Sequence, residues 1–417
     1  MHRPPTAQVL SRALRVMLPK VTERLAFAVA GQLDAVPIWD AHEWRIARAV
    51  AVIHGISPLL AGRQKWQAPE GWQNFLQAQR SHTAARYARM AALLEDIDYR
   101  AVREGLAFLP LKGAALHRLE LYSPGDRPMA DIDLLVRPEQ LGSMSRLLEG
   151  LGYRSVAASS GGEVLVPRDQ PPPRLSEHRD NGITIELHTT ISHAMPMRLV
   201  DITATLWPKH PRLGRNHYGS LAALMGHLLM HAAVNMQVRT VRMIQLHDMA
   251  LLAPQLSVAD WSSLLTPADG SAAPWWAMPP LQLLRRYYPD ALPAATIDRV
   301  AAACPTLLRA AARRQKLADV SVSNPRRALF PALLWAGSMP EACRFMSRRI
   351  RHGSRALRGR PGLPEASEIQ PWIVRSHRRR ALDVFLRRPR PETVMMLTAA
   401  LASDPSFAAD YEQPSVA

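Results

Sequence analysis

The segment from Asp131 to Val136 (DIDLLV) alternates acidic and apolar residues and then finishes in apolar ones. Because successive side chains of a strand point to opposite faces, the pattern predicts a core strand with Asp131 and Asp133 on one face. The opposite face receives Ile132, Leu134 and Val136. Two carboxylates about 7 Å apart on one strand face can bind one or two hard cations such as Mg²⁺, which prefer oxygen ligands.

A second alternating segment, residues 183–189 (ITIELHT), predicts another strand. Glu186 and His188 share one face of it, and Ile183, Ile185 and Leu187 take the other. If this strand lies beside the first, Glu186 supplies a third carboxylate to the same place. Three acids around a divalent metal are what phosphoryl or nucleotidyl transfer requires, because metal ions neutralise phosphate oxygens and activate the acceptor hydroxyl.

The residues before the acidic strand predict a strand, a glycine turn and a helix. An amphipathic helix runs to about Glu104, residues 106–111 are a short apolar strand, and residues 114–121 are helical. Between them, Lys112 and Gly113 place a cation and an unobstructed backbone at a helix start, where phosphate is favoured. In the loop that enters the acidic strand, Arg127 could hold another phosphate through two hydrogen bonds.

The rest of the chain predicts helices on both sides of this unit. Residues 141–151 carry a helical stripe, residues 159–173 suggest a mobile loop or irregular hairpin, and the pattern from Ser220 onward is helical. The predicted fold class is α+β, a small mixed sheet flanked by helices. Its expected regions are an N-terminal helical region (1–104), an α/β core (105–215), a helical domain (216–320) and an Arg-rich basic C-terminal region (321–417).

Taken alone, an acidic pair in a strand is often a solvated edge, and Lys-Gly is a common dipeptide. The apolar neighbours of Asp131 and Asp133 argue against an exposed edge, because exposed acids rarely occur within such a run. A zinc protease is not indicated, since His227 and His231 enclose Leu, Leu and Met where the H-E-x-x-H motif has its glutamate. His231 is either an interior histidine or a residue lining the nucleotide or acceptor cleft.

Four short motifs together resemble a bacterial family of uncharacterised nucleotidyltransferases in the DNA polymerase β-like superfamily. They are residues 111–116 (LKGAAL), Arg127 with residues 130–136 (ADIDLLV), residues 151–153 (LGY) and residues 185–188 (IELH). His231 and Asp248 look like the C-terminal helical signature of that family. The resemblance covers roughly residues 50–253.

The resemblance implies that Asp131 and Asp133 are metal ligands and that Glu186 is the third acid, serving as a ligand or as a base toward the acceptor. Lys112 and Gly113 would take the place of the Gly-Ser phosphate-binding turn. The candidate nucleotide-binding residues are Lys112, Gly113, Arg127, His188 and His231. The sequence departs from the wider pattern because Ala114 stands in the serine position and sixteen residues separate Ala114 from Asp131.

The charge is concentrated near the C-terminus. The chain carries a net charge of +17 over 417 residues, and residues 321–390 hold sixteen arginines, no lysine and four acidic residues, a net of +12. This region could bind nucleic acid through phosphate, contact an anionic surface or acidic partner, or form a solvated face. The sequence has two cysteines, no apolar run long enough to span a membrane and no signal-peptide core. These features predict a cytoplasmic protein.

These observations lead to one principal hypothesis and two alternatives. The first is an enzyme that uses Mg²⁺ or Mn²⁺ to transfer a nucleoside monophosphate from a nucleoside triphosphate such as ATP to an acceptor, with release of pyrophosphate. The acceptor could be a small molecule, a sugar, a peptide, a protein or RNA. The alternatives are a nucleotide-binding regulatory protein without turnover and a toxin-like transferase that modifies tRNA.

Overall fold

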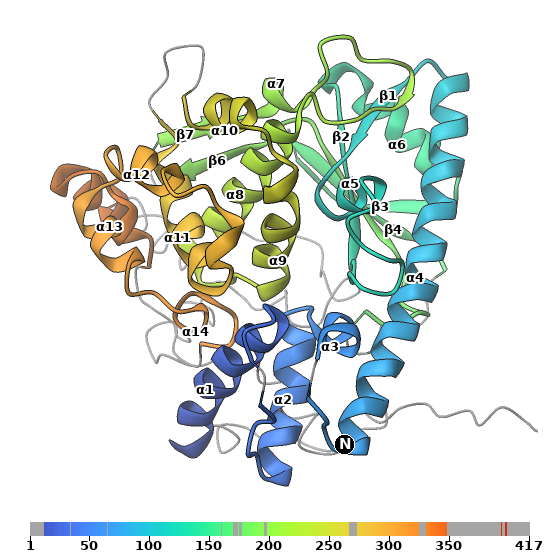
Figure 1. The fold of residues 1–417 in the computed structure, drawn as a ribbon. Helices are drawn as coiled ribbons and strands as arrows, with labels where there is room; N and C mark the ends of the chain where they lie inside the picture. The colour runs from blue at the N-terminus through green and yellow to red at the C-terminus, as the bar shows by residue number, and fades with distance from the viewer. Residues whose placement is uncertain are drawn as a thin grey trace, which may run out of the picture.

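The computed structural model describes residues 12–347, apart from residues 34, 65, 160, 170–173, 175–176, 196–197, 267–272 and 325–330, together with residues 393 and 397. The chain is a mixed α+β protein with a six-stranded sheet and flanking helices (Figure 1). This arrangement confirms the predicted fold class. Most of the Arg-rich C-terminal region, and the prediction that it contacts nucleic acid, lie outside the described residues.

Four helices precede the sheet. They are α1 (Arg12–Val29), α2 (Ala41–Ile53), α3 (Ser57–Arg63) and α4 (Glu70–Arg103). Asp40 begins α2 by accepting hydrogen bonds from the backbone N–H groups of His42 and Glu43, which are otherwise unpaired at a helix start. The helix expected to end near Glu104 is α4. It begins at Glu70 and is therefore longer than the apolar stripe in the sequence indicated. It runs from α2 and α3 at one end of the molecule to the sheet at the other (Figure 1).

The strand order in the main sheet is β3-β4-β5-β2-β1-β8. The strands are β1 (Ala107–Pro110), β2 (Asp131–Val136), β3 (Tyr153–Ser159), β4 (Gly162–Pro167), β5 (Thr184–His188) and β8 (Gly214–Arg215). The central strand β2 is antiparallel to β1 and parallel to β5. β3 and β4 form an antiparallel hairpin. Residues 162–167 of the segment expected to be a mobile loop or irregular hairpin are the second strand of this hairpin, whose first strand begins at Tyr153. A separate two-stranded sheet contains β6 (Ser192–Met195) and β7 (Arg198–Asp201).

The two faces of the main sheet differ. One face packs against α4 and against α6 (Leu141–Glu149), with Ile132, Leu134 and Val136 buried there. The other face carries the acidic residues beside a smaller apolar cluster of Leu109, Leu111, Leu135, Ile191 and Leu206. Two short helices, α5 (Lys112–Arg118) and α7 (Thr203–Leu206), connect strands. The predicted alternation of acidic and apolar faces along the strand is therefore confirmed.

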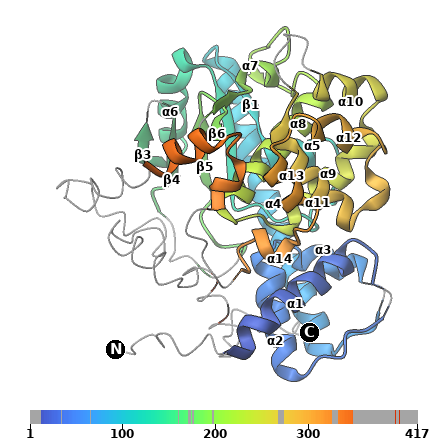
Figure 2. The same cartoon turned by 90° about the vertical axis from the view of Figure 1, so that its left-hand side faces the viewer.

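A second set of helices follows the sheet in the chain. They are α8 (Leu221–Val238), α9 (Met243–Leu252), α10 (Val258–Leu265), α11 (Met278–Tyr287), α12 (Thr296–Ala301), α13 (Thr306–Ala312) and α14 (Leu317–Val320). Viewed from the side, α14 lies between these helices and α1–α3 (Figure 2). Among the described residues, α8 alone has the length and composition of a membrane span, and 67% of it is buried inside the fold. Burial inside the fold is typical of a core helix.

Candidate active site

Parallel pairing between β2 and β5 brings the acidic residues together. Asp131 lies opposite Thr184, Asp133 opposite Glu186, and Leu135 opposite His188. Residues paired in this way project from the same face of a sheet. The predicted meeting of Asp133 and Glu186 is therefore observed, although they are separated by 52 residues in the sequence.

Asp133 is the centre of the site. Its Oδ1 accepts hydrogen bonds from Lys112 Nζ at 3.0 Å and from His188 Nε2 at 2.9 Å, and its side chain is almost fully buried. His188 Nε2 also lies 3.6 Å from Glu186 Oε2. One ligand atom from each of Asp133, Glu186 and His188 falls within 4.8 Å of the others, a spacing that could hold a metal ion. His188, expected at the nucleotide, thus belongs to the acidic cluster.

The pKa values separate the two aspartates. Burial would raise the pKa of Asp133, but the charge of Lys112 and the hydrogen bond from His188 hold it well below its ordinary value. Asp131 accepts no hydrogen bond from the described residues, and burial with the neighbouring charges of Asp133 and Glu186 raises its pKa to about 7. Burial and the charge of Asp133 also raise the pKa of Glu186. An additional cation would relieve this repulsion, since opposite charge favours the ionised carboxylate.

These donors fit a hard divalent cation. Asp133 and Glu186 provide carboxylate oxygens, Asp131 provides a carboxylate with no hydrogen bond or ion pair among the described residues, and His188 provides a ring nitrogen. The Lys112 ammonium already contributes a positive charge at Asp133. Burial alone would lower the pKa of Lys112, yet the charges of Asp133 and Asp131 raise it above its ordinary value. The negative charge of the cluster therefore favours a positively charged group beside it.

Lys112 is held in an unusual backbone conformation. Its φ is +48°, in the left-handed region that residues other than glycine rarely adopt. Its backbone N–H donates to the Tyr218 hydroxyl at 3.2 Å, and that hydroxyl lies 2.8 Å from His227 Nδ1. Burial and the charge of Lys112 lower the pKa of His227 to about 3, so the neutral ring can accept from Tyr218. Non-glycine residues with positive φ cluster at functional sites, where surrounding contacts maintain them.

Arg127, which was expected at phosphate, is paired with a buried carboxylate, that of Asp248. Its guanidinium is buried and donates to Asp248 through Nε and Nη2, both at 2.7 Å, while Nη1 approaches Pro128 O. Tyr122 donates to the same Asp248 carboxylate at 2.7 Å. Through these contacts Arg127 ties the loop before β2 to α9, and its Nε and Nη2 edge is already occupied by the Asp248 carboxylate.

Gly113 has a packing role that explains why a glycine occurs there. A Cβ atom on Gly113 would collide with Arg127 Nη1 and would lie 2.8 Å from Met129 Sδ. The absence of a side chain at Gly113 therefore leaves room for the Arg127 guanidinium beside the start of α5. Gly113 thus has a packing reason of its own, beside its expected role at phosphate.

His231 lies on the side of α8 that faces the acids. Its side chain hydrogen-bonds Asn235 at 3.2 Å, and burial with the charge of Lys112 lowers its pKa well below the ordinary value. Burial and the charges of Lys112 and His188 lower the pKa of His193 on β6. His231 on α8 and His193 on β6 thus lie close enough to Lys112 for its charge to lower their pKa values.

Arg86 on α4 is a positioning residue that the sequence gives no reason to select. It is 3% exposed. Its guanidinium donates to the carbonyl oxygens of Met129 and Ala130, which precede β2, and of Asn181 and Gly182, which precede β5. It therefore joins the entries of the two strands that carry the acids. In the sequence it is one arginine among many on a helix.

A mixed sheet with two carboxylates on one strand and a third on its parallel neighbour defines a nucleotidyltransferase-type core. A family model described as Uncharacterised nucleotidyltransferase matches residues 40–273, more than half of the chain. The chain belongs to this family, which confirms the resemblance found in the sequence. No curated protein and no solved structure matches the chain.

Proposed function

We propose that this chain transfers a nucleoside monophosphate from a nucleoside triphosphate to an acceptor, and that the transfer depends on Mg²⁺ or Mn²⁺. An acceptor oxygen forms a bond to the α-phosphorus, the bond to the β-phosphate oxygen breaks, and pyrophosphate leaves. Membership of a nucleotidyltransferase family supports the reaction class. The observation that carries the proposal is the convergence of Asp133, Glu186 and His188, with the Asp131 carboxylate beside them.

Asp131, Asp133 and Glu186 would hold the divalent metal, with His188 oriented by its hydrogen bond to Asp133. Such a metal neutralises the phosphate oxygens and lowers the pKa of a bound hydroxyl. Glu186 is the more exposed of the two acids in the cluster, with 36% of its side chain accessible against 7% for Asp133. Its raised pKa suits a group that accepts the proton of the acceptor hydroxyl.

Lys112 supplies the remaining positive charge. Its ammonium contacts Asp133 and lies near Asp131 and Glu186, so it can neutralise charge on a triphosphate placed against the same acids. Arg127, expected at the phosphate, has its guanidinium bound to Asp248. The charge available for phosphate in this arrangement is that of Lys112 and of the metal.

The test uses each α-³²P-labelled nucleoside triphosphate with Mg²⁺ or Mn²⁺ and a cell extract fractionated into protein, RNA and small molecules. We expect label on a discrete acceptor with the wild-type protein and loss of at least about a hundredfold in rate with Asp133→Asn, since electrostatic contributions of this kind are worth several kcal/mol. Asp290→Asn, which alters an exposed aspartate far from the sheet, is the matched control and keeps the wild-type rate.

The fractions also separate the alternatives. Label on RNA supports the transferase that modifies tRNA, and label on a protein or small molecule identifies another acceptor class. Nucleotide binding without transfer in any fraction would overturn the enzyme in favour of a nucleotide-binding regulatory protein. Transfer that persists in Asp133→Asn would remove the acidic cluster from the reaction.

A further inference from the structure

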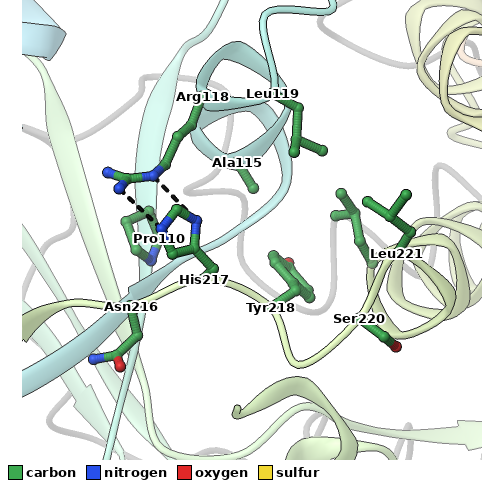
Figure 3. A pocket seen from close by; sticks show the side chains of 10 residues that line it. Pro110, Ala115, Arg118, Leu119, Asn216, His217, Tyr218, Ser220 and Leu221 are labelled. Atoms are coloured by element: carbon green, nitrogen blue, oxygen red, sulfur yellow. Dashed lines mark hydrogen bonds between the residues drawn. The ribbon is translucent and has the colours of Figure 1, made fainter. Parts of the chain in front are cut away.

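A pocket distinct from the acidic cluster lies between α5 and the start of α8 (Figure 3). It has a volume of about 240 Å³. Its walls are largely apolar and come from Pro110, Ala115, Leu119, Tyr218, Leu221 and Leu224. A concave, mostly apolar cavity with a few polar groups is the usual form of a small-molecule site.

The polar groups that line the pocket are not equally available to a ligand. The Asn216 side chain is buried and bonded to the backbone at Phe108, Arg212 and Gly214, and Ser220 Oγ caps α8 by accepting from Ala223 N. Arg118 and His217 remain, and both are exposed at the pocket. Arg118 Nε donates to His217 Nδ1 at 3.1 Å, and Arg118 Nη2 lies 2.9 Å from the other ring nitrogen, Nε2 (Figure 3). A ligand would therefore meet a guanidinium and an imidazole at one end and apolar carbon elsewhere.

The charge around this end of the pocket is positive. Arg215 is paired with Glu95 at 2.7 Å and with Asp98 at 3.6 Å. Within the described part of the chain, Arg118 and Arg212 form no ion pair with a carboxylate. Burial and the neighbouring arginine charges lower the pKa values of both Arg118 and His217, which is the electrostatic signature of a cation cluster short of anions.

We propose that this pocket binds a small organic anion with a planar apolar body against Tyr218 and Leu224 and one carboxylate or phosphate group against Arg118 and His217. The apolar body supplies burial, and the anion supplies a charge-assisted contact to a planar guanidinium. The inference does not rest on the proposed transfer reaction. Tyr218 links the two sites, because its ring lines the pocket and its hydroxyl accepts from Lys112 N.

Isothermal titration calorimetry without nucleotide or metal tests the proposal with four probes. Benzoate and phenyl phosphate carry both features, benzyl alcohol lacks the charge, and inorganic phosphate lacks the apolar body. We expect the first two to bind about tenfold or more tightly than the last two, a difference of about 1.4 kcal/mol. Benzoate and phenyl phosphate also distinguish a carboxylate from a phosphate ligand.

Two variants locate the binding. Arg118→Gln, at an exposed helix position, should weaken both anions about tenfold and leave benzyl alcohol unchanged. Ala115→Leu, which extends a side chain into the pocket, should weaken every probe that has an apolar body. Arg103→Gln on α4 removes an equally exposed arginine elsewhere and should change nothing, and circular dichroism verifies that each variant is folded. Absence of binding by all probes, equal binding of benzyl alcohol and benzoate, or affinity unaffected by a folded Arg118→Gln variant would each overturn the proposal.

Discussion

Arg127 and Asp248 form a two-point contact in which Nε meets Oδ1 and Nη2 meets Oδ2, each at 2.7 Å. Only 10% and 2% of the two side chains are exposed. The pair connects the loop before β2 to α9, and Tyr122 donates to the same carboxylate. A buried charge that loses its partner is strongly destabilising, so this contact makes the position of the acidic strand depend on the helices that follow it.

Asp248→Asn should therefore lower the free energy of unfolding by about 3 kcal/mol or more, because it leaves the Arg127 charge buried and unneutralised. Urea denaturation measures the loss. Asp126→Asn is the matched control, since Asp126 lies in the same loop and forms a 2.9 Å pair with Arg80 on α4, with the Arg80 and Asp126 side chains 40% and 24% exposed. Its cost should stay below about 1 kcal/mol. Equal losses in the two variants would contradict the structural role of Arg127.

Gly113→Ala should destabilise the protein by about 1–3 kcal/mol, because the new methyl group collides with an Arg127 guanidinium that Asp248 holds in place. Gly62→Ala is a suitable comparison within another helix, where a Cβ has no neighbour within 4 Å. Alanine should stabilise that position by up to about 1 kcal/mol. Thermal denaturation of both variants is sufficient, and a Gly113→Ala protein as stable as wild type would refute the packing explanation.

Arg86→Met should cost about 3 kcal/mol or more, since it removes the donor of the buried Met129 carbonyl before β2 and the Arg86 hydrogen bonds to the partly buried carbonyls before β5. Arg103→Met, on the exposed surface of the same helix, should lie within about 0.5 kcal/mol of wild type. Hydrogen exchange gives a local readout. We expect faster exchange of the β2 and β5 amides in Arg86→Met than in the control, and unchanged exchange there would exclude the positioning role.

Lys112→Met should increase the affinity for free Mn²⁺ several-fold, because it removes a positive charge 3.0 Å from Asp133 Oδ1. Titration followed by electron paramagnetic resonance measures this affinity in the absence of nucleotide. Lys209→Met, at an exposed position, is the control and should bind Mn²⁺ as wild type does. Weaker binding in Lys112→Met would mean that Lys112 does not compete with a cation at the cluster.

Acid should destabilise the fold through its buried neutral histidines. Burial and the charge of Arg242 lower the pKa of His54 to about 3, and its ring is bonded to Ser323 Oγ and Met243 N. The unfolded state binds a proton below about pH 6.5 and the folded state does not, so stability is present above that pH and is lost as the pH falls toward 3. Each such histidine contributes about 1 kcal/mol of loss by pH 5.5.

The melting temperature should consequently fall from pH 7.5 to pH 5.5. The drop should be smaller in His54→Gln, after allowing for its lower stability at pH 7.5, than in His210→Gln, which alters an exposed histidine. Parallel pH profiles for the two variants would remove His54 from the acid response.

The sequence predicted the acidic strand to the residue, because alternation of Asp with buried apolar residues leaves one orientation for Asp131 and Asp133. It also predicted Glu186 and His188 on one face of β5. The pairing of β2 with β5 followed only as an assumption, since strand order depends on contacts distant in the sequence. The pairing of Arg127 with Asp248 was not predicted, because a buried partner on α9 cannot be recognised from the loop sequence alone.

Other features had no local signal. Lys112 adopts positive φ through the contacts of Tyr218 and Asp133, which lie 106 and 21 residues away. The pocket beside Tyr218 combines residues of β1, α5 and the β8–α8 connection. The start of β3 was missed because Tyr153–Ser159 contains small and polar residues without a clear alternation.

The parallel pairing of β2 with β5 also bears on how the protein acquires its site during folding. Asp133 can meet Glu186 only after the intervening α6 and the β3–β4 hairpin have been accommodated, and non-local parallel contacts form slowly because chain entropy is lost before they stabilise anything. A chain still emerging from the ribosome, or one cleaved ahead of residue 184, therefore has a β2 strand whose carboxylates lack their third member. The complete set of three carboxylates thus forms late in folding.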